Sequence, residues 1–292
     1  MSYKICCIGH ITLDKVITPH QTIYMPGGTA YYFSHAIANF CKNYLLVTAV
    51  ADSELSSVVE LQNRGVEVKR FFTRHTVFFE NRYGTNPDDR TQRVLQQADA
   101  FSTDDLMKLE AEVFHFGPLL ANDIPNEAIK ALAAKGKVSF DVQGLLRKVE
   151  NEKVIPVDWP AKEQVLPHAH YLKANEEEMK ILTGTNDVEE GAKQLADWGV
   201  KEVVITLGSK GSVVYCDETF YRIPPYSPKQ LVDATGCGDT YMAGYLCKRA
   251  DGSSIQEAVV FAAAMATLKT ETSGPFKGTQ QDVESAMKSF GK

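Results

Sequence analysis

Short runs of β-branched and aromatic residues alternate along the chain with longer segments whose apolar residues recur at helical spacing. Residues 4–8, 44–50, 113–116, 137–141, 169–173, 202–206 and 212–215 are expected to be sheet strands. Residues 29–40, 53–63, 126–134, 175–182, 188–198 and 255–268 are expected to be helices. This alternation is typical of βαβ units, so we predict an α/β fold with a doubly wound, mainly parallel sheet between helices.

Residues 71–97 depart from this alternation. Segments 71–83 and 90–97 are both strand-like, and the residues between them, 84–89, form a dense cluster of turn formers. We predict a small β-hairpin that leaves the main sheet and forms most of a lid over the sheet's carboxyl edge, where such folds bind ligands. The alternative is an antiparallel extension of the sheet edge. No linker or repeat divides residues 1–292, so a single domain is expected.

The charge, the apolar runs and the cysteine content of the chain argue against several classes of protein. The 31 Lys and Arg against 37 Asp and Glu give a net charge of −6, which argues against a nucleic-acid partner. The longest fully apolar run, 258–266, has nine residues, about half of the roughly 18 that span a bilayer. Six cysteines without a C-x-x-C pair fit reduced thiols, and the apolar run near the N-terminus is too short for a signal peptide. We therefore expect a cytoplasmic protein without a membrane partner.

The most informative segment is V-D-A-T-G-C-G-D-T-Y-M-A-G at 232–244. Gly236 and Gly238 stand at the start of an apolar helix, where unpaired backbone N–H groups and the positive end of the helix dipole favour an anion. Asp239 places a carboxylate beside that anion, which suggests a base that activates a hydroxyl next to a phosphoryl group. The alternative is that Asp239 is merely an N-cap and that the glycines merely make a tight turn.

Two other phosphate-binding signatures fit poorly. A dinucleotide-binding G-x-G-x-x-G would need glycine or alanine at Tyr241 and would follow the first strand, whereas this segment lies near the C-terminus. The pattern G-x-x-x-x-G-K-[ST] does not occur in the sequence, so a P-loop is excluded.

The pattern D-x-T-G-x-G-D before an alanine-rich helix resembles the second signature of the ribokinase-like carbohydrate kinases, the PfkB family, and the resemblance extends over essentially the whole chain. It implies a ribokinase-like fold, Asp239 as catalytic base, and backbone N–H groups of Gly236, Cys237 and Gly238 around the transferred phosphoryl group. The segments G-H-I-T-L-D at 9–14 and P-G-G-T-A at 26–30 resemble the family's sugar-binding strand end and di-glycine helix start.

The resemblance implies that Asp14 and the Gly27–Gly28 backbone hold substrate hydroxyls. A carboxylate and a backbone without side chains suit a polyol that is gripped by hydrogen bonds. The alternative for Asp14 is a solvated loop residue.

Further matches assign the phosphate donor, ATP with Mg²⁺. The T-L-G-S-K-G segment resembles the family's turn that approaches nucleotide phosphates, through Thr206, Gly208 and Gly211, although alone it could be a hairpin turn. The segment after Lys173 resembles the N-x-x-E motif, in which Asn175 and Glu178 organise magnesium and its waters. An acidic first helical turn also suits the helix dipole without any metal.

Asp233 and Thr235 coincide with positions that help many relatives bind a monovalent cation such as K⁺. By the same analogy, helix 255–268 and residues 270–275 should flank the adenine. The resemblance also leaves a homodimer open.

Several features resemble the myo-inositol kinase subgroup: the D-V-Q-G-L-L-R segment at 141–147, G-G-T at 27–29, and F-E-N-R-Y at 79–83 ahead of R-x-Q-R at 90–93. Tyr32 replaces the asparagine usual in ribokinase, which argues against ribose. Inositol is uncharged, so its pocket needs hydrogen-bonding groups such as Asp14, Asn81 and Gln143 rather than basic residues.

Four arginines keep a phosphosugar acceptor open: Arg82, Arg90, Arg93 and Arg147. A solvated hairpin rim is the alternative for them, while Arg147 is also a candidate for contact with the transferred phosphate. Another sugar or a nucleoside remains an alternative acceptor. Two other classes of protein remain: a dinucleotide-dependent oxidoreductase and a catalytically silent ligand sensor on the same scaffold.

Two further side chains carry local hypotheses. The helix N-terminus beside Cys237 can lower the pKa of its thiol, so alkylation there would block the phosphate turn; the plainer interpretation is a small residue tolerated for its size. His168 and His170 lie two residues apart, but no third ligand follows at metal-site spacing, so turn or solvent roles are expected.

Overall fold

The computed structural model describes residues 2–84 and 90–290. A nine-stranded sheet in the order β15-β14-β13-β12-β9-β8-β1-β4-β5 forms its centre. The seven strands from β5 to β13 run parallel, and β14 and β15 add antiparallel strands at one edge. The strands are β1 (Tyr3–Ile8), β4 (Tyr44–Val50), β5 (Glu67–Phe72), β8 (Ala111–Phe116), β9 (Lys137–Asp141), β12 (Ala169–Asn175), β13 (Glu202–Thr206), β14 (Ser212–Cys216) and β15 (Thr219–Ile223).

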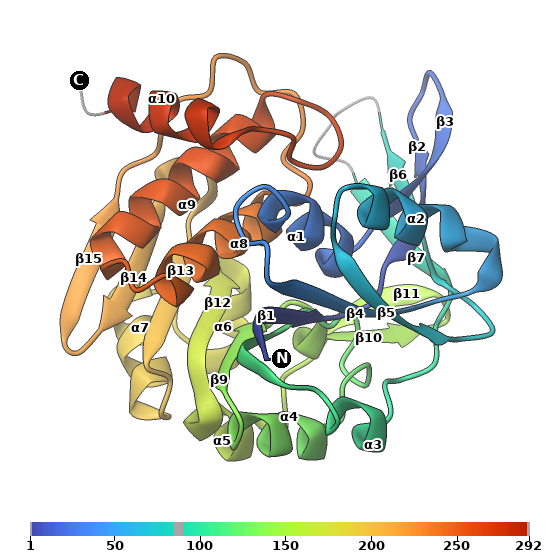
Figure 1. Cartoon of the computed structure of the whole chain (residues 1–292), viewed down its shortest axis with the longest axis horizontal. Helices are drawn as coiled ribbons and strands as arrows, with labels where there is room; N and C mark the ends of the chain where they lie inside the picture. Colours follow the sequence, from blue (N-terminus) through green and yellow to red (C-terminus); the bar gives the residue numbers. More distant parts are fainter. Residues whose placement is uncertain (1, 85–89, 291–292) are drawn as a thin grey trace.

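Helices cover both faces of this sheet because its strands are apolar on both sides (Figure 1). Successive residues of β1 enter opposite cores: Cys7 packs with one set of helices and Cys6 with the other. The first set is α1 (Thr29–Ile37), α2 (Leu55–Asn63), α8 (Cys237–Ala250), α9 (Ile255–Thr270) and α10 (Gln280–Phe290). The second set is α3 (Thr103–Leu106), α4 (Asn126–Ala133), α5 (Lys162–Val165), α6 (Glu176–Thr183) and α7 (Val188–Asp197). The predicted doubly wound α/β fold is confirmed.

A second, six-stranded sheet has the order β10-β11-β7-β6-β2-β3. Its strands are β2 (Thr12–Ile17), β3 (Thr22–Gly27), β6 (Val77–Tyr83), β7 (Arg90–Gln96), β10 (Arg147–Glu150) and β11 (Lys153–Pro156). The predicted hairpin is present as the antiparallel pair β6–β7 and lies outside the main sheet, so the edge-extension alternative is wrong. Its expected first strand is divided, because residues 71 and 72 end β5 of the central sheet; residues 85–89 of its turn lie outside the described residues.

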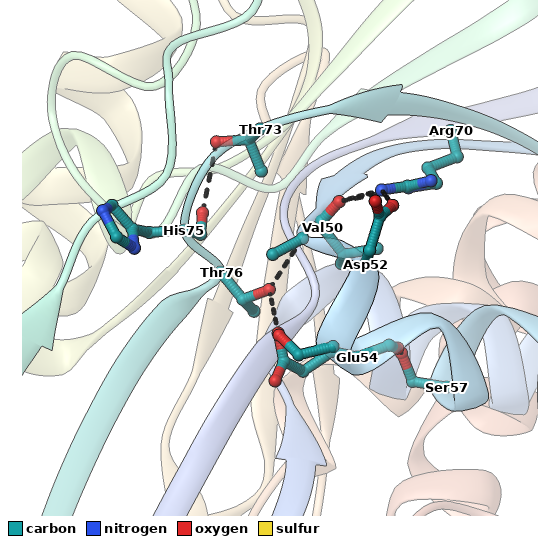
Figure 2. Close-up of polar contacts among 10 residues, drawn as sticks. Val50, Asp52, Glu54, Ser57, Arg70, Thr73, His75 and Thr76 are labelled. Carbon is teal, nitrogen blue, oxygen red and sulfur yellow. Dashed lines mark hydrogen bonds and ion pairs between the residues drawn. The ribbon is translucent and has the colours of Figure 1, made fainter.

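The crossover from the central to the second sheet, residues 73–76, is fixed by buried hydroxyl groups (Figure 2). The Thr76 hydroxyl donates to Glu54 Oε2 at 2.7 Å and accepts the Ala51 amide at 2.9 Å. The Thr73 hydroxyl lies 3.1 Å from both the His75 carbonyl oxygen and Asp99 Oδ2, which share its one proton. These bonds set where β6 begins relative to the carboxyl end of β4.

Within the described residues, no helix combines the length and the hydropathy needed to cross a membrane.

Candidate active site

Two helices begin side by side at the carboxyl edge of the central sheet. Helix α1 follows Gly28 at φ 87°, and helix α8 follows Gly236 at φ 75°, both in a backbone region that favours glycine. A Cβ on Gly236 would lie 2.3 Å from the ring of Tyr32, so glycine is also required for the contact between the two helices. The glycines therefore bring two helix N-termini, with their positive dipole ends, to one place.

The turn that opens α8 presents unpaired amides. The N–H groups of Gly236, Gly238 and Asp239 have no hydrogen-bond acceptor among the described residues, whereas the Cys237 N–H donates to the Ala234 carbonyl at 3.2 Å. Gly236 is the N-cap and no side chain caps the helix, so the interpretation of Asp239 as an N-cap is wrong. Three free amides at a helix start form a cradle for an anion.

Asp239 is the third residue of α8 and is half-buried among the side chains of the site. Burial raises the pKa of its carboxyl group to about 7; Asp141 and Glu178 add to the increase, while Lys173 and a hydrogen bond from Thr29 oppose it. A carboxyl group with a pKa near neutrality can exchange a proton at physiological pH, as a general base must.

Lys173, near the end of β12, is buried in the middle of three carboxylates. Its Nζ donates to Asp141 Oδ2 at 2.9 Å and lies 3.9 Å from Glu178 Oε2. Burial alone would lower the pKa of Lys173, but Asp141, Glu178 and Asp239 outweigh it, so the pKa is raised and the ammonium stays charged. Burial likewise opposes ionisation of Asp141, yet Lys173 keeps the pKa of that carboxyl group below its usual value.

Lys173 also reaches the anion cradle. A Cβ on Gly238 would lie 3.0 Å from Lys173 Nζ, so glycine at this position lets the ammonium approach the turn. The site therefore holds a fixed positive charge beside the free amides, and both would face the oxygens of a bound phosphoryl group.

Asn175 and Glu178 form a capping box at the start of α6. The Asn175 side chain accepts the Glu178 amide, and Glu178 Oε2 accepts the Asn175 amide, each at 2.8 Å. These residues line a hollow of about 200 Å³ together with Gln143, Arg147 and Glu177. The described residues contain no cluster of three or more His, Cys, Asp or Glu that forms a metal site by itself. Carboxylates at the hollow fit an ion such as Mg²⁺ that keeps waters and is shared with donor phosphates.

The turn between β13 and β14 lies next to this capping box, because Thr206 pairs in register with Asn175. It is a hairpin connection, as the sequence allowed, closed by a bond from the Leu207 amide to the Gly211 carbonyl at 2.9 Å. Gly208 at φ 56° and Gly211 at φ 97° shape it, and a Cβ on Gly211 would lie 2.1 Å from the Ile223 carbonyl oxygen. The predicted donor residues thus adjoin one another at the carboxyl ends of neighbouring strands.

Four of the predicted acceptor residues lie in strands of the second sheet: Asp14, Gly27, Asn81 and Arg147. Gly28 precedes α1, and Gln143 lies between β9 and β10. Asp14 is inside β2 rather than at a loop, and a Cβ on Gly27 would lie 2.5 Å from its Oδ2. Register places Asn81 on the same sheet face as Asp14, with Gln92 opposite it donating to Asn81 Oδ1 at 2.9 Å. This face carries carboxylate and amide groups beside the apolar Phe79, which pairs with Asp14.

Tyr32 links the acceptor face to the catalytic carboxylate. Burial raises the pKa of its phenol, and the negative charges of Asp14, Asp233 and Asp239 each raise it further, so the ring lies within electrostatic range of both Asp14 and Asp239.

The opposite face of the second sheet holds the basic residues. Glu80 is paired with Lys15 at 2.9 Å, with Arg93 at 3.5 Å and with Arg82 at 3.8 Å. Alternation along β6 directs Glu80 away from the side that carries Asn81. Arg82 and Arg93 thus belong to an outer rim, and the side chain of Arg90 lies outside the described residues.

A buried lysine occupies the segment predicted to bind a monovalent cation. Lys269 Nζ donates to the Asp233 carbonyl at 2.9 Å and lies 3.4 Å from Asp233 Oδ2. Asp233 Oδ1 accepts the Thr235 amide at 2.9 Å, while Thr235 itself is exposed. The oxygens of Asp233, one of the two residues assigned to a cation, are therefore in contact with an ammonium group.

The residues of this site lie within a family match that spans nearly the whole chain. Residues 3–281 match the model of the pfkB family carbohydrate kinases. The chain belongs to this family. It is accordingly a phosphotransferase, and the oxidoreductase alternative is excluded.

Similarity to individual kinases shows which members of the pfkB family this chain resembles. A solved pyrophosphate-dependent kinase in the ribokinase family, complexed with a pyrophosphate analog and myo-inositol, is 31% identical with a TM-score of 0.87, covering 96% of this chain and 99% of that one. A cytidine kinase of Thermococcus kodakarensis is 29% identical over 86% of this chain and 90% of its own length. The ribokinase of Arabidopsis thaliana, solved with ribose and ATP, shares the fold at 21% identity and a TM-score of 0.80, covering 99% of each chain.

Two expectations about cysteine and histidine chemistry can be settled. Burial raises the pKa of the Cys237 thiol to about 12, so the expectation that the helix N-terminus lowers it is wrong. The thiol points to the Ala266 carbonyl, which suits a small packed residue. His168 and His170 line an open hollow at the amino ends of β9 and β12, at the opposite edge of the sheet from the site.

Sequence reasoning missed four residues that complete the site: Thr29, Asp141, Gln92 and Lys269. Thr29, Asp141 and Gln92 lie inside motifs that the sequence highlights, so their position was available but their role was not. Lys269 had a weak signal, as a lysine ending an otherwise apolar helix.

Proposed function

We propose that this pfkB family kinase transfers a phosphoryl group to a hydroxyl of a small neutral polyol, with myo-inositol as the acceptor. The observation that carries the proposal is the Asp239 carboxyl group, with its pKa raised to about 7, in the first turn of the helix that opens with the anion cradle. The acid and amide lining of Asp14, Asn81 and Gln92 suits hydroxyl groups. The outward pairing of Arg82 and Arg93 argues against a phosphosugar.

In the proposed reaction, Asp14 and the backbone at Gly27 orient the acceptor so that one hydroxyl reaches Asp239. Asp239, when ionised, accepts the proton of that hydroxyl as its oxygen attacks the phosphorus. The free amides of Gly236 and Gly238, together with Lys173, face the charge on the transferring oxygens. Packing of the second sheet over the site would exclude water, which is the role we propose for it as a lid.

Magnesium belongs to this proposal through the capping box. Glu178 and Glu177, with Asn175, would hold the ion through its waters at the 200 Å³ hollow, and the ion would offset charge on the donor phosphates. Gln143 and Arg147 line the same hollow, so we assign them to the phosphate side of the acceptor rather than to its ring.

Two donors are favoured by separate observations. ATP is supported by exposed apolar side chains, Leu231 at 73% and Val232 at 49% exposure, beside the end of α9 where the adenine is expected. Pyrophosphate is supported by the 31% identical kinase that is pyrophosphate-dependent. The free amides and Lys173 would receive the terminal phosphoryl group of either donor.

A nucleoside is the second candidate acceptor, favoured by the 29% identical cytidine kinase. A nucleoside base would need an apolar or stacking surface next to its ribose site. On the acceptor face, Phe79 and Val94 are buried in a small core with Leu119 and Leu120, so they do not offer a surface on which a base could stack. We therefore rank the nucleoside below the polyol.

The test is a matrix of acceptors and donors with the purified chain. Myo-inositol, ribose, fructose and cytidine are each incubated with Mg²⁺ and either ATP or pyrophosphate, and phosphate esters are quantified by phosphorus NMR. The proposal predicts the highest kcat/KM for myo-inositol with at least one donor. A higher kcat/KM for cytidine with either donor would replace the polyol by a nucleoside, and binding of myo-inositol without any ester would favour a silent sensor.

Two wider assignments accompany the proposal. We propose a cytoplasmic location, since the cysteines of the chain are free. We propose a homodimer through the edge strand β3, where Ile23 and Tyr24 are exposed. Sedimentation of the chain and of an Ile23→Lys variant tests the dimer, which the variant should dissociate.

A further inference from the structure

Lys269, in the last turn of α9, is a lysine with no exposed surface. Lysine is almost never fully buried unless it is paired. Its Nζ donates to two carbonyl oxygens, of Asp233 at 2.9 Å and of Thr272 at 3.3 Å, and lies 3.4 Å from Asp233 Oδ2. The three N–H bonds of the ammonium thus have three oxygen partners.

These oxygens belong to two segments that frame the anion cradle. Asp233 lies three residues before Gly236, and its Oδ1 accepts the amide of Thr235, inside the segment that enters the cradle. Thr272 lies in the loop after α9, and the Asp233 amide donates to the Thr270 carbonyl at 3.2 Å. Lys269 therefore joins the loop after α9 to the segment that sets the position of Gly236 and Gly238.

A monovalent cation such as K⁺ would need the same partners: one carboxylate and several carbonyl oxygens. The ammonium of Lys269 already supplies one positive charge at these atoms, balanced by Asp233. A second cation on the same oxygens would meet a like charge within a few ångströms, and the interior would screen that repulsion weakly. The residues present therefore do not fit an additional K⁺.

We propose that Lys269 is a built-in monovalent cation, a positioning residue that holds the anion cradle and makes this enzyme independent of K⁺. Removing its side chain would leave an anionic, oxygen-lined cavity at Asp233. That cavity would accept K⁺ or NH₄⁺, and the variant would depend on the ion that the native chain does not need. The kinetic part of this proposal rests on the proposed function, whereas its binding and stability parts do not.

The first experiment uses the unmodified chain in KCl and in tetramethylammonium chloride at equal ionic strength. The melting temperature, the donor Kd from calorimetry and kcat/KM for the donor should agree between the two salts. A loss of more than about tenfold in kcat/KM, or a similar weakening of donor binding, in tetramethylammonium would overturn the proposal. The donor Kd from calorimetry tests the proposal even if the chain phosphorylates no acceptor.

The second experiment compares Lys269→Met with Lys288→Met, which removes an exposed lysine of α10, in the same salts. In tetramethylammonium, K269M should bind donor at least about tenfold more weakly than the native chain, while K288M should match it. Added KCl or NH₄Cl should raise the melting temperature of K269M saturably and restore most of its donor affinity, with no effect on K288M.

Two results for K269M would overturn the proposal. One is a folded variant with native donor affinity in tetramethylammonium. The other is a folded variant whose lost affinity neither K⁺ nor NH₄⁺ restores, which would indicate a packing role alone. Lys269→Arg supplies a charged control that should stay insensitive to K⁺. If K269M does not fold, Lys269→Gln is measured in its place, and the native chain's indifference to K⁺ remains a separate requirement.

Discussion

Replacing Asp239 with asparagine tests two properties of its carboxylate: its role as the base in catalysis and its cost to the stability of the fold. Asparagine has nearly the same shape but cannot accept a proton at neutral pH. Removal of a general base that also positions the acceptor should lower kcat by at least about a thousandfold. The Kd of myo-inositol should change by less than about threefold, because Asp14 and the backbone at Gly27 hold the ring.

The same substitution should stabilise the protein. Burial raises the pKa of Asp239 from 3.8 to about 7, and one pKa unit corresponds to about 1.4 kcal/mol, so the ionised carboxylate costs the fold at most roughly 4 kcal/mol. Asparagine is also polar and loses the attraction of Lys173, so we expect about half of this, about 2 kcal/mol, to be recovered. For a chain of this length that is a rise in Tm of roughly 4 °C.

The stability gained by D239N should depend on pH, and the raised pKa of Asp239 determines in which direction. Because the folded pKa is raised, the penalty is absent below the unfolded value of 3.8, grows as pH rises to about 7, and is constant above it. Calorimetric melting at pH 8 and at pH 5 should therefore show a larger gain for D239N at pH 8. The exposed Asp104 in α3 supplies a control, and D104N should leave Tm and kcat unchanged. A Tm of D239N at or below the native value at pH 8 would refute the desolvated carboxylate, and kcat within tenfold of native would refute its role as base.

Three further outcomes follow from the same geometry. The kcat/KM of the native chain should rise about tenfold per pH unit below pH 7 and level off above it, because Asp239 must be ionised; a flat profile between pH 5 and 8 in a stopped assay would contradict this. Lys173→Met removes the ammonium that compensates the negative charge of Asp141, Glu178 and Asp239, so it should lower the free energy of unfolding by about 3 kcal/mol or more in urea titrations, whereas the exposed Lys210→Met should cost under about 1 kcal/mol. Gly236→Ala combines a positive φ with a Cβ 2.3 Å from the ring of Tyr32, so it should destabilise the chain by several kcal/mol. The control Gly184→Ala, at φ 80° with open space around it, should cost only about 1 kcal/mol. Equal losses of stability in the two variants would show that the contact with the ring is unimportant.

The central sheet could be predicted because its strands and helices carry their signals locally. Three strands, β4, β9 and β13, have the predicted bounds, since each is a short segment whose β-branched or aromatic residues stand between turn or helix signals. The helix expected from residue 175 begins one residue later, because Asn175 ends β12 and caps α6.

The second sheet was predicted only as its hairpin. Strand β2 is half-buried along most of its length, β3 is mostly exposed and contains Pro26, and β10 and β11 have only four residues each, so none has a clear hydrophobic pattern. Their pairing depends on β6 and β7 being in place, and this dependence cannot be read from local sequence.

The site was predictable where glycine and acidic residues form motifs, and not where contacts join distant segments. Lys173 and Asp141 are 32 positions apart, and Lys269 and Asp233 are 36 apart, so their pairing depends on the fold. The hypothesis of a lowered pKa for Cys237 was wrong for a related reason, because the helix dipole is a local feature whereas burial determines the outcome; the alternative of a small residue tolerated for its size agrees with that burial.

The most direct test of the account follows the phosphoryl group itself. Radiolabelled ATP and radiolabelled pyrophosphate are each incubated with myo-inositol, Mg²⁺ and either the native chain or D239N, and the labelled products are separated. The account predicts a labelled inositol monophosphate from the native chain with at least one donor, and at least about a thousandfold less from D239N. Label that appears only as inorganic phosphate, or equal transfer by the two proteins, would contradict it.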